Sequence, residues 1–508
     1  MQSSSLRIVL ACGTCLGLLS GCAVGPDYHR PAAPRVDRYT EAPLQAATGS
    51  ANAPDGKSQH FAIGQDVAGE WWALFRSPAL TTLIATALRQ NPSLESAQQT
   101  LHQAQETTLA AEGSFLPQVT GLFNRQRQKF SPAESGLSAP VRGQSFAVPP
   151  FTVYTAQVNV SYTFDIWGQT RRTVEADAAQ SEYQRSQLEG AYNMLAANTA
   201  VAAINAASLR AQIDAEEKLV GAERDLLKVV RQQFELGGAT GTDVATQEAQ
   251  LANTEALVVP LRTQLAQARD QLAAYLGRVP SEAAVPVIAL DDLTLPGEVP
   301  VSLPSRLVEQ RPDIRASAAQ LHAATAQVGV AISNRLPQLT LSAFAGSAPA
   351  RIGDLFTPGN GAWSILNQLA GPIFEGGTLL HQQRAAMAQM KAAAANYQNT
   401  VVTAFQNVAD VLTALTQDSA ALAANQAAEQ AAGRSLSLAQ LQYRAGGVSY
   451  LTVLTAQTQY QNAVIGLIRA RAARYSDTVG LFAALGGGWW NRADVAPPPE
   501  GFVRSLLP

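Results

Sequence analysis

The sequence predicts an elongated α+β membrane protein built from two tandem copies of one unit, and three observations support this prediction. Two long stretches contain no proline and carry the same helical pattern, from Phe151 to Val259 and from Ile373 to Ala496. The motifs that begin and end the elements of each copy recur at constant offsets. A further segment alternates strictly between apolar and polar residues, which is typical of a β-strand with one apolar face and one polar face.

Each long helical stretch carries a seam of mostly apolar residues at steps of four and three. The first seam runs from Leu188 to Phe234, and the second returns 209 residues later, from Tyr397 to Tyr443. Eleven of the fourteen seam positions in each copy are apolar or alanine, which indicates a coiled coil. The exceptions are Thr199, Glu216 and Glu223 in the first copy and Asp418, Asn425 and Glu429 in the second. A helix over about 169–236 would be about 100 Å long, which is more than a compact domain needs.

Composition limits the functional classes. The chain of 508 residues has a formal net charge of −3 and 15% charged residues, so it lacks the basic footprint of a nucleic-acid-binding protein. After the leader no run of about 18 apolar residues occurs, which excludes a transmembrane helix, whereas a membrane β-barrel gives a weaker signal and stays possible. No cysteine follows Cys22 and the five histidines form no ligand-spaced cluster, so we expect no disulfide framework and no metal site. No nucleophile–base set or phosphate loop is found, so we expect neither an enzyme nor a cofactor.

Residues 1–21 have the features of a secretory signal peptide, with Arg7, an apolar core and then small residues. The last four residues up to Cys22, Leu-Ser-Gly-Cys, resemble a bacterial lipobox, which predicts a lipoprotein signal peptide, cleavage before Cys22 and a covalent lipid on that residue. The alternative is an ordinary signal peptide with a chance cysteine. Ala23 favours delivery to the outer membrane by bacterial sorting rules. Residues 22–70 are rich in Pro, Ala, Gly and Ser, which predicts a lipid-anchored tether that is extended or partly disordered.

Motifs divide the rest of the chain into a first repeat at residues 71–290, a second repeat at residues 291–490 and a C-terminal tail at residues 491–508. In each repeat a start signal with proline, Gln-Asn-Pro at 90–92 or Gln-Arg-Pro at 310–312, predicts a helix that ends at a Leu-Pro-Gln motif. Both motifs recur at an offset of 220 residues without a gap, which indicates duplication.

The clearest strand signal runs from Tyr154 to Ile166, where apolar and polar residues alternate over 13 positions. This is the length and pattern of a strand in a membrane β-barrel, with lipid on one face and water on the other. Its partner is expected at about 118–130, which gives a β-hairpin at about 117–166. A weaker hairpin is expected in the second repeat at about 337–374. Two soluble hairpins packed on the helices are the alternative.

Each strand pair leads into a long helical hairpin, at about 169–277 in the first repeat and about 377–486 in the second. Glycine pairs reverse the chain at the tips because glycine adopts the left-handed conformation that ends helices. These glycines are Gly237, Gly238, Gly446 and Gly447. Pro260 falls in the first return helix, where proline can kink a helix.

Four strands per chain cannot close a barrel, and an open sheet edge inside a membrane leaves unpaired backbone groups in hydrocarbon. Strands that enter the membrane therefore require oligomerisation. Two chains would give eight strands, a barrel filled by its own side chains, and three would give twelve strands, enough for a lumen. Long helices that continue a barrel would make a tunnel across the periplasm, which favours three chains.

The segment from Cys22 to Pro31, Cys-Ala-Val-Gly-Pro-Asp-Tyr-His-Arg-Pro, resembles the start of outer-membrane efflux lipoproteins of the NodT/OprM type. The paired Leu-Pro-Gln motifs, Ile-Phe-Glu-Gly-Gly, Tyr-Arg-Ala-Gly-Gly and the terminal Leu-Gly-Gly-Gly-Trp are similar to motifs of the TolC superfamily. The resemblance implies a homotrimer whose twelve-stranded outer-membrane β-barrel continues into a periplasmic α-helical barrel. It also implies a passive exit duct for small molecules, partnered by a periplasmic membrane-fusion adaptor and an inner-membrane transporter of the resistance-nodulation-division (RND) type.

In the TolC superfamily, acidic residues ring the constriction near the second tip. Those positions fall here at Thr452 and Thr455, neither of which is acidic, so this sequence departs from the family pattern and a carboxylate cation-binding ring is not expected. A hydroxyl ring could constrict the duct sterically, with a weaker block of ions. The family's tyrosine–aspartate link between hairpins corresponds to Tyr443 and Asp243, which we expect to hold the closed state by a hydrogen bond. The alternative is that Asp243 only caps its helix. The glycine pairs are implied to mark the adaptor-docking tips.

Two other functions use similar parts. A periplasmic coiled-coil adaptor or scaffold would not enter the membrane, but adaptors usually carry one helical hairpin and this chain has two. A type I protein-secretion exit channel would share the architecture, although the lipobox and the segment from Cys22 to Pro31 favour small-molecule efflux. The sequence does not name the substrate, because an exit duct is permissive and the transporter selects.

Overall fold

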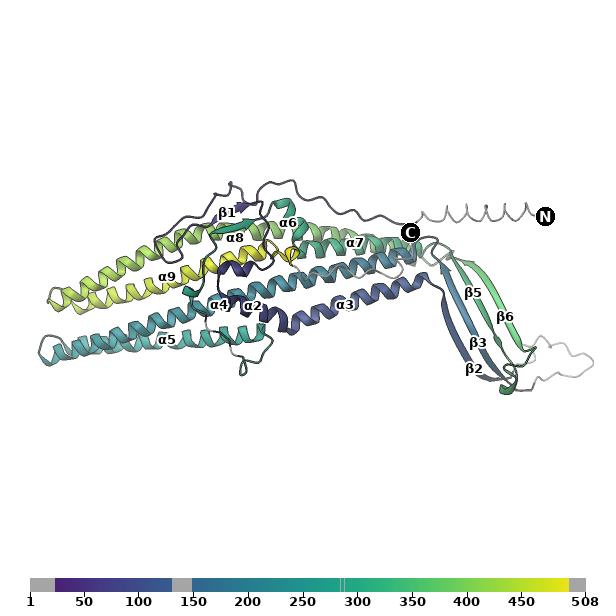
Figure 1. The fold of residues 1–508 in the computed structure, drawn as a ribbon, viewed down its shortest axis with the longest axis horizontal. Coiled ribbons are helices and arrows are strands. Elements are labelled where there is room, and N and C mark those ends of the chain that lie inside the picture. The colour runs from purple at the N-terminus through teal and green to yellow at the C-terminus, as the bar shows by residue number, and fades with distance from the viewer. Residues whose placement is uncertain (1–22, 130–148, 284, 287, 493–508) are drawn as a thin grey trace, which may run out of the picture.

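Two helices of 67 residues, one in each repeat, form the long axis of the molecule: α4 (Gln169–Glu235) and α8 (Thr378–Arg444) (Figure 1). The computed structural model describes residues 23–129, 149–283, 285–286 and 288–492. Each long helix follows a glycine with positive φ, Gly168 at 77° or Gly377 at 88°, which lets the chain turn from a strand into a helix. At 1.5 Å per residue each helix is about 100 Å long, as the sequence predicts.

The return helices α5 (Gly241–Tyr275) and α9 (Tyr450–Ala484) pack on the far halves of α4 and α8 and complete two helical hairpins. Both tips lie at the end of the molecule away from the four-stranded sheet (Figure 1). α5 is continuous across Pro260. Seam positions such as Val220, Val230 and Val408 are buried, so the four-and-three pattern does mark the contact faces.

Two further helices occupy the strand-side half of the molecule, α3 (Pro92–Glu112) on α4, and α7 (Pro312–Ser333) between α4 and α8. Both start at the predicted prolines. Asn91 caps α3 by accepting the N–H of Ser93, and its amide donates to the carbonyl of Tyr275. The sequence did not reveal the shorter elements in the described chain, which are α2 (Pro78–Gln90), α6 (Pro304–Gln310) and the 3-10 turns η1 (Trp71–Phe75), η2 (Gly113–Phe115), η3 (Leu290–Asp292), η4 (Ile352–Asp354) and η5 (Trp489–Asn491).

Four antiparallel strands form one sheet at the opposite end from the tips, in the order β2-β3-β5-β6. They are β2 (Gln118–Gln128), β3 (Phe151–Phe164), β5 (Gln338–Ser347) and β6 (Gly361–Ala370). The two predicted hairpins therefore join through β3 and β5, one from each repeat. β3 ends at Phe164 and not at Ile166, because the carboxylate of Asp165 accepts the N–H groups of Thr170 and Arg171 at the start of α4, at 2.9 and 3.1 Å. The sequence of residues 131–150, rich in Pro, Ser and Gly, predicts the loop of the first hairpin, and almost all of it lies outside the described residues.

The segment before Trp71 is extended, as predicted, but its described part packs on the helices instead of forming a loose tether. A short strand in it, β1 (His60–Ile63), pairs in parallel with β4 (Glu298–Val301), and the sequence did not reveal this pairing. Gln59 donates to the hydroxyl of Thr478 on α9 at 3.1 Å, and the buried Arg474 of α9 donates to the carbonyl of Lys57 at 3.1 Å.

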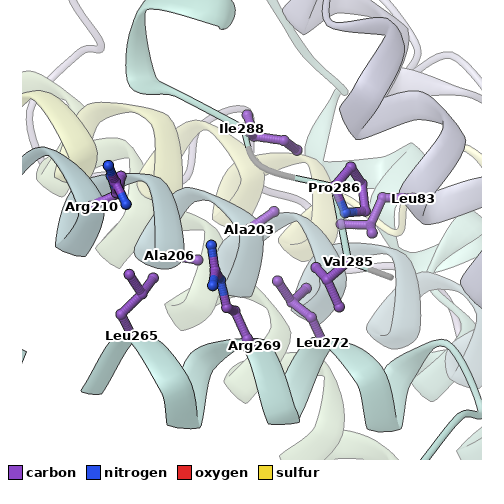
Figure 2. A pocket seen from close by; sticks show the side chains of 10 residues that line it. All are labelled: Leu83, Ala203, Ala206, Arg210, Leu265, Arg269, Leu272, Val285, Pro286 and Ile288. Atoms are coloured by element: carbon purple, nitrogen blue, oxygen red, sulfur yellow. The ribbon is translucent and has the colours of Figure 1, made fainter. Parts of the chain in front are cut away.

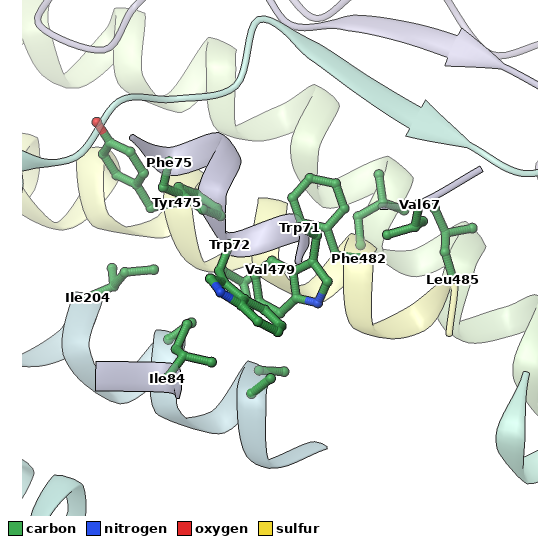
Figure 3. Close-up of a cluster of buried hydrophobic side chains, with 14 of the residues drawn as sticks. Val67, Trp71, Trp72, Phe75, Ile84, Ile204, Tyr475, Val479, Phe482 and Leu485 are labelled. Carbon is green, nitrogen blue, oxygen red and sulfur yellow. The ribbon is translucent and has the colours of Figure 1, made fainter. Parts of the chain in front are cut away.

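An aromatic cluster at mid-length forms the largest core, shown in Figure 3. Trp71 and Phe75 come from η1, and their rings contact Phe482 and Tyr475 of α9 at centroid distances of 5.3 and 6.2 Å. Ile204 of α4 closes the other side. The core therefore joins the first repeat, the second repeat and the N-terminal segment at one level of the rod.

Candidate functional site

The two hairpin tips have the same backbone geometry. At the first tip, two glycine N–H groups bond to carbonyls of the last turn of α4. The N–H of Gly238 donates to the carbonyl of Gln233 at 2.7 Å, and the N–H of Gly237 donates to Phe234 at 3.0 Å. Gly237 has φ of 75°. This is a Schellman motif, in which a left-handed glycine ends the helix and its last carbonyls are satisfied.

The second tip repeats the motif 209 residues later. The N–H of Gly447 donates to Gln442 at 2.8 Å, the N–H of Gly446 donates to Tyr443 at 3.0 Å, and Gly446 has φ of 74°. Both glycine pairs therefore lie at the outermost turns of the rod, where the sequence analysis places them.

The two return helices start differently. At the first tip, Thr240 and Asp243 form a capping box: the Thr240 hydroxyl accepts the N–H of Asp243, and the Asp243 carboxylate accepts the N–H of Thr240 at 2.8 Å. The equivalent pair at the second tip is Ser449 and Thr452, whose hydroxyls lie 3.3 Å apart. The second tip therefore has a neutral hydroxyl where the first has a carboxylate.

The capping role of Asp243, the alternative in the sequence analysis, is formed in the structure. The expected hydrogen bond with Tyr443 is not formed within this chain, because the Tyr443 hydroxyl is buried and has no hydrogen-bond partner among the described residues. The two groups are nevertheless close. Burial raises the pKa of Tyr443, and the negative charge of Asp243 raises that pKa further. The ring of Tyr443 meets that of Tyr450 edge to face at 5.4 Å.

The hydroxyl row predicted on α9 is exposed in the single chain. Thr455 donates to the carbonyl of Leu451 at 2.9 Å, which leaves its hydroxyl oxygen on the surface. Thr452, Gln459 and Asn462 are also exposed on the same face of this helix. All four side chains are uncharged, so this face offers hydroxyl and amide groups to a solute.

A polar ladder that is buried except at Arg469 connects the first hairpin to α9, and it was not predicted from the sequence. Its three rungs are Gln212 to Arg469, Glu216 to Gln461 and Glu223 to Gln457, at 3.1, 2.6 and 2.7 Å. The signal was present, because Glu216 and Glu223 are charged residues at seam positions. A buried carboxylate is costly unless hydrogen bonds compensate it, so the Glu216 and Glu223 rungs favour the register in which the two hairpins pack.

Glu223 is the most enclosed member of the ladder. Its side chain is 1% exposed, and its Oε1 atom also accepts the hydroxyl of Thr254 on α5 at 3.0 Å. Burial raises the pKa of Glu223 and of Glu216. Three helices, α4, α5 and α9, therefore meet at one carboxylate.

The family model described as outer membrane efflux protein matches residues 83–278 and 303–487 of this chain. The chain belongs to the outer membrane efflux protein family. The two matched ranges fall in the two repeats, and together they include α4, α5, α8, α9 and all four strands of the sheet.

Relatives agree in name and in fold. The chain is 30% identical over 485 residues to the probable efflux pump outer membrane protein TtgC of Pseudomonas putida, covering 94% of this chain and 95% of the relative. It is 30% identical over 457 residues to the pyoverdine export outer membrane protein OpmQ of Pseudomonas aeruginosa, covering 89% and 94%. The solved outer-membrane channel OprN matches with a TM-score of 0.81 and 25% identity, covering 92% of this chain and 100% of OprN.

This outer membrane efflux protein is thus an outer-membrane component of an efflux system, and its helical body extends into the periplasm. A periplasmic coiled-coil adaptor or scaffold, the alternative considered above, is a different class of protein from the outer membrane efflux family that this chain matches. Of the helices in the described part of the chain, none combines the length and apolarity that a membrane crossing requires. Within those residues, no group of three or more His, Cys, Asp or Glu side chains could hold a metal ion.

A small pocket lies where α4 and α5 meet the linker that follows α5 (Figure 2). Apart from Arg210 and Arg269, its lining is aliphatic, with no carboxylate, thiol, imidazole or hydroxyl group. Arg210 is paired with Asp214 at 3.0 Å. The residues that line the pocket therefore supply no nucleophile and no metal ligand.

The ladder predicts a pH dependence of stability. Because the pKa of Glu223 is raised above its ordinary value of 4.5, the folded protein binds a proton at this site more tightly than the unfolded chain. The contribution of Glu223 protonation to the stability of the folded protein is complete below pH 4.5, and it is lost as the pH rises through the raised pKa. We expect Glu223→Gln to stabilise the protein at pH 8 by about 1 kcal/mol and by less at pH 5, measured by thermal unfolding in detergent.

Glu255→Gln is the matched control, because Glu255 forms an exposed ion pair with Arg224. It should change stability by less than about 0.5 kcal/mol at either pH. A larger gain for Glu223→Gln at pH 5 than at pH 8 would contradict the assignment of a raised pKa.

Proposed function

We propose that three copies of this chain form a passive exit duct for small molecules in a tripartite RND-type efflux pump. In this proposal the three sheets close into a twelve-stranded outer-membrane barrel, and the helical hairpins continue it as a periplasmic tunnel. A lipid on Cys22 anchors each chain, and the hairpin tips meet a periplasmic membrane-fusion adaptor and, through it, the inner-membrane transporter. Cys22 lies outside the described residues, so its acylation rests on the lipobox.

The register of the sheet supports entry into lipid. Across the four strands, Val119, Val160, Ala343 and Ile365 are successive neighbours on one face. The adjacent row on the opposite face is Gln118, Ser161, Ser342 and Leu366, which is mainly polar. In these two rows one face is apolar and the other mainly polar, which fits a barrel wall with lipid outside and water inside.

The observation that carries the proposal is that both edges of the sheet are unpaired in the described chain, which gives a physical reason for assembly. β2 and β6 each have one neighbour in the described chain, so each leaves one side of its backbone unpaired. In hydrocarbon those N–H and C=O groups have no water to bind, so the edge of one chain must pair with the edge of another. Three chains give twelve strands, which is wide enough for a lumen.

The cargo class follows from the relatives and from the channel wall. TtgC is named for an efflux pump and OpmQ for pyoverdine export, which supports export of small molecules. The exposed α9 face with Thr452 and Thr455 carries no fixed charge. A duct constricted by this face would select by size more than by charge, and polyvalent cations would block it weakly.

A pair of neighbouring residues in β6 tests the barrel. Ile365 belongs to the apolar face and is 63% exposed in the single chain, whereas Ser364 belongs to the opposite face. We expect Ile365→Lys to lose insertion and conductance in planar bilayers, because a lysine facing lipid costs about 2–4 kcal/mol near the midplane. Ser364→Lys should still insert, with altered conductance. Equal insertion of both variants would contradict the assignment of the faces.

The closed state is proposed to depend on a latch between Asp243 and Tyr443. The Oδ2 atom of Asp243 accepts both bonds from Thr240, and Oδ1 accepts none among the described residues. Tyr443 offers a buried hydroxyl without a partner nearby. In the assembled channel, a small movement of α8 toward α5 would let this hydroxyl donate to Oδ1 and hold the two hairpins together.

Tyr443→Phe tests the latch because it removes the hydroxyl and keeps the ring. A hydrogen bond to a carboxylate contributes about 1.5–3 kcal/mol, so loss of the latch should raise the open probability of single channels by about tenfold or more. Tyr460 is a half-buried tyrosine on α9, so Tyr460→Phe is the control and should leave gating unchanged. Unchanged gating in Tyr443→Phe would contradict the latch proposal, and it would not bear on the proposal that the protein is an exit duct.

A further inference from the structure

The residues that follow Cys22 occupy a tightly built socket at the strand end of the helical body. Val24 uses both of its backbone groups there: its N–H donates to the carbonyl of Trp167 at 3.0 Å, and its carbonyl accepts from Nε of Arg172 at 3.3 Å. Trp167 lies between the end of β3 and the start of α4. The segment is therefore fixed at the level where the chain leaves the sheet.

Three glycines make the socket deep enough for a backbone. A Cβ atom on Gly329 of α7 would lie 2.7 Å from the carbonyl oxygen of Val24, and one on Gly25 would lie 2.5 Å from Cα of Gly329. A Cβ atom on Gly168 would lie 2.7 Å from Cα of Ala23. None of these distances is compatible with a side chain, so the segment and its socket require glycine on both sides.

Arg172 fixes the segment electrostatically. Its side chain is 6% exposed, and its two terminal nitrogens bind Asp27 at 2.6 Å and Glu175 at 2.7 Å. Asp27 is on the segment, and the hydrogen bond and charge of Arg172 lower its pKa. A buried arginine needs such partners, so the docked segment supplies one of the two carboxylates that Arg172 binds.

The next residues continue the contact along α7 and then reach α6. The ring of Tyr28 stacks on His322 at a centroid distance of 4.2 Å and an interplanar angle of 13°. His322 is held in turn by Glu175, at 2.9 Å. Arg30 then donates to the carbonyl of Val308 at 3.3 Å. Asp27, Tyr28 and Arg30, all in the motif from Cys22 to Pro31, thus each have a partner.

The duplication provides an internal comparison. At the repeat-equivalent positions, Arg172 corresponds to His381, Gly329 to Leu109, and His322 to His102. His102 is 65% exposed, and its side chain faces Glu106 of its own helix. Arg172 and Gly329 therefore occur where the N-terminal segment docks and are replaced at the equivalent positions of the other copy. Their identity is explained by the segment and not by the repeated fold.

We propose that this socket is a binding site for the chain's own residues 23–30, and that it sets the membrane depth of the lipid on Cys22. The proposal rests on the acylation proposed above. Consecutive Cα atoms are about 3.8 Å apart, so the lipid would start beside Ala23, at the end of the sheet where the strands enter the membrane. Docking and lipid insertion are then two linked binding events, each of which raises the effective concentration for the other.

Amide hydrogen exchange of residues 23–31 in the mature protein tests the socket, and the Cys22→Ser variants are exported on an ordinary cleavable signal peptide because the lipobox needs Cys22 for cleavage. We expect the amide of Val24 to be protected both in the lipidated protein and in Cys22→Ser, because the socket and not the lipid holds it. Arg172→Ala in the Cys22→Ser background should speed this exchange by about tenfold or more. Gly329→Val should have the same effect by closing the groove. His381→Ala, at the repeat-equivalent position, is the control and should change nothing.

Fast exchange in Cys22→Ser alone, or no effect of Arg172→Ala and Gly329→Val, would overturn the socket. Mass spectrometry of the N-terminal peptide reports acylation separately, so a missing lipid would refute the anchor while the exchange data still decide the socket. As a second readout, the double variant Cys22→Ser/Arg172→Ala should yield less outer-membrane trimer than either single variant. If the double variant yields as much trimer as the lower-yielding of the two single variants, the proposed link between docking of the segment and lipid insertion is wrong.

Discussion

The fold depends on the hydrogen-bonding requirement of two strand edges. β2 and β6 end a four-stranded sheet whose one face is apolar, and lipid cannot satisfy the backbone groups that these edges present. In the proposed membrane-inserted state, a single chain therefore leaves both edges of its sheet unpaired. The helical body follows from the same requirement, because each repeat passes from its last strand straight into a 67-residue helix. The arrangement that closes the strands around an axis would also place α4 and α8 around that axis.

The two repeats have the same arrangement of long helices and strands, and they differ in the side chains that cap the return helices and connect the two hairpins. Asp243 in the first tip is replaced by Thr452 in the second, so only the first return helix has a charged cap. The buried ladder depends on Glu216 and Glu223, whose seam equivalents are Asn425 and Ala432. Duplication thus supplies the rod, while individual substitutions tie its two hairpins together.

Sequence periodicity predicted the long elements well because their burial is local and repetitive. A seam at steps of four and three specifies a helix and its contact face, and alternation over 13 residues specifies a strand, so α4, α8 and β3 match the prediction within a few residues. The glycine pairs predicted the tips because positive φ favours glycine. The family resemblance added the adaptor and transporter partners, which no single-chain pattern contains, whereas the lipid anchor was predicted from the lipobox and the need for assembly from the number of strands.

The N-terminal segment was harder to predict, because its partners are distant in the chain. Gln59 bonds to Thr478, Trp71 packs on Phe482, and Asp27 pairs with Arg172. A stretch rich in proline, alanine and glycine shows no periodicity even when it is firmly bound. The capping role of Asp243 follows from its place at a helix start, whereas the proposed bond to Tyr443 would require movement between hairpins that local sequence does not specify.

Pairing between sister chains is tested most directly by disulfide cross-linking of the two sheet edges. One chain would carry one cysteine in β2, scanned over residues 121–125, and one in β6, scanned over residues 364–367. If the edges pair between chains, some combinations should give a covalently closed trimer on oxidation in outer membranes. Cross-links confined to single chains, or none in any combination, would contradict the account.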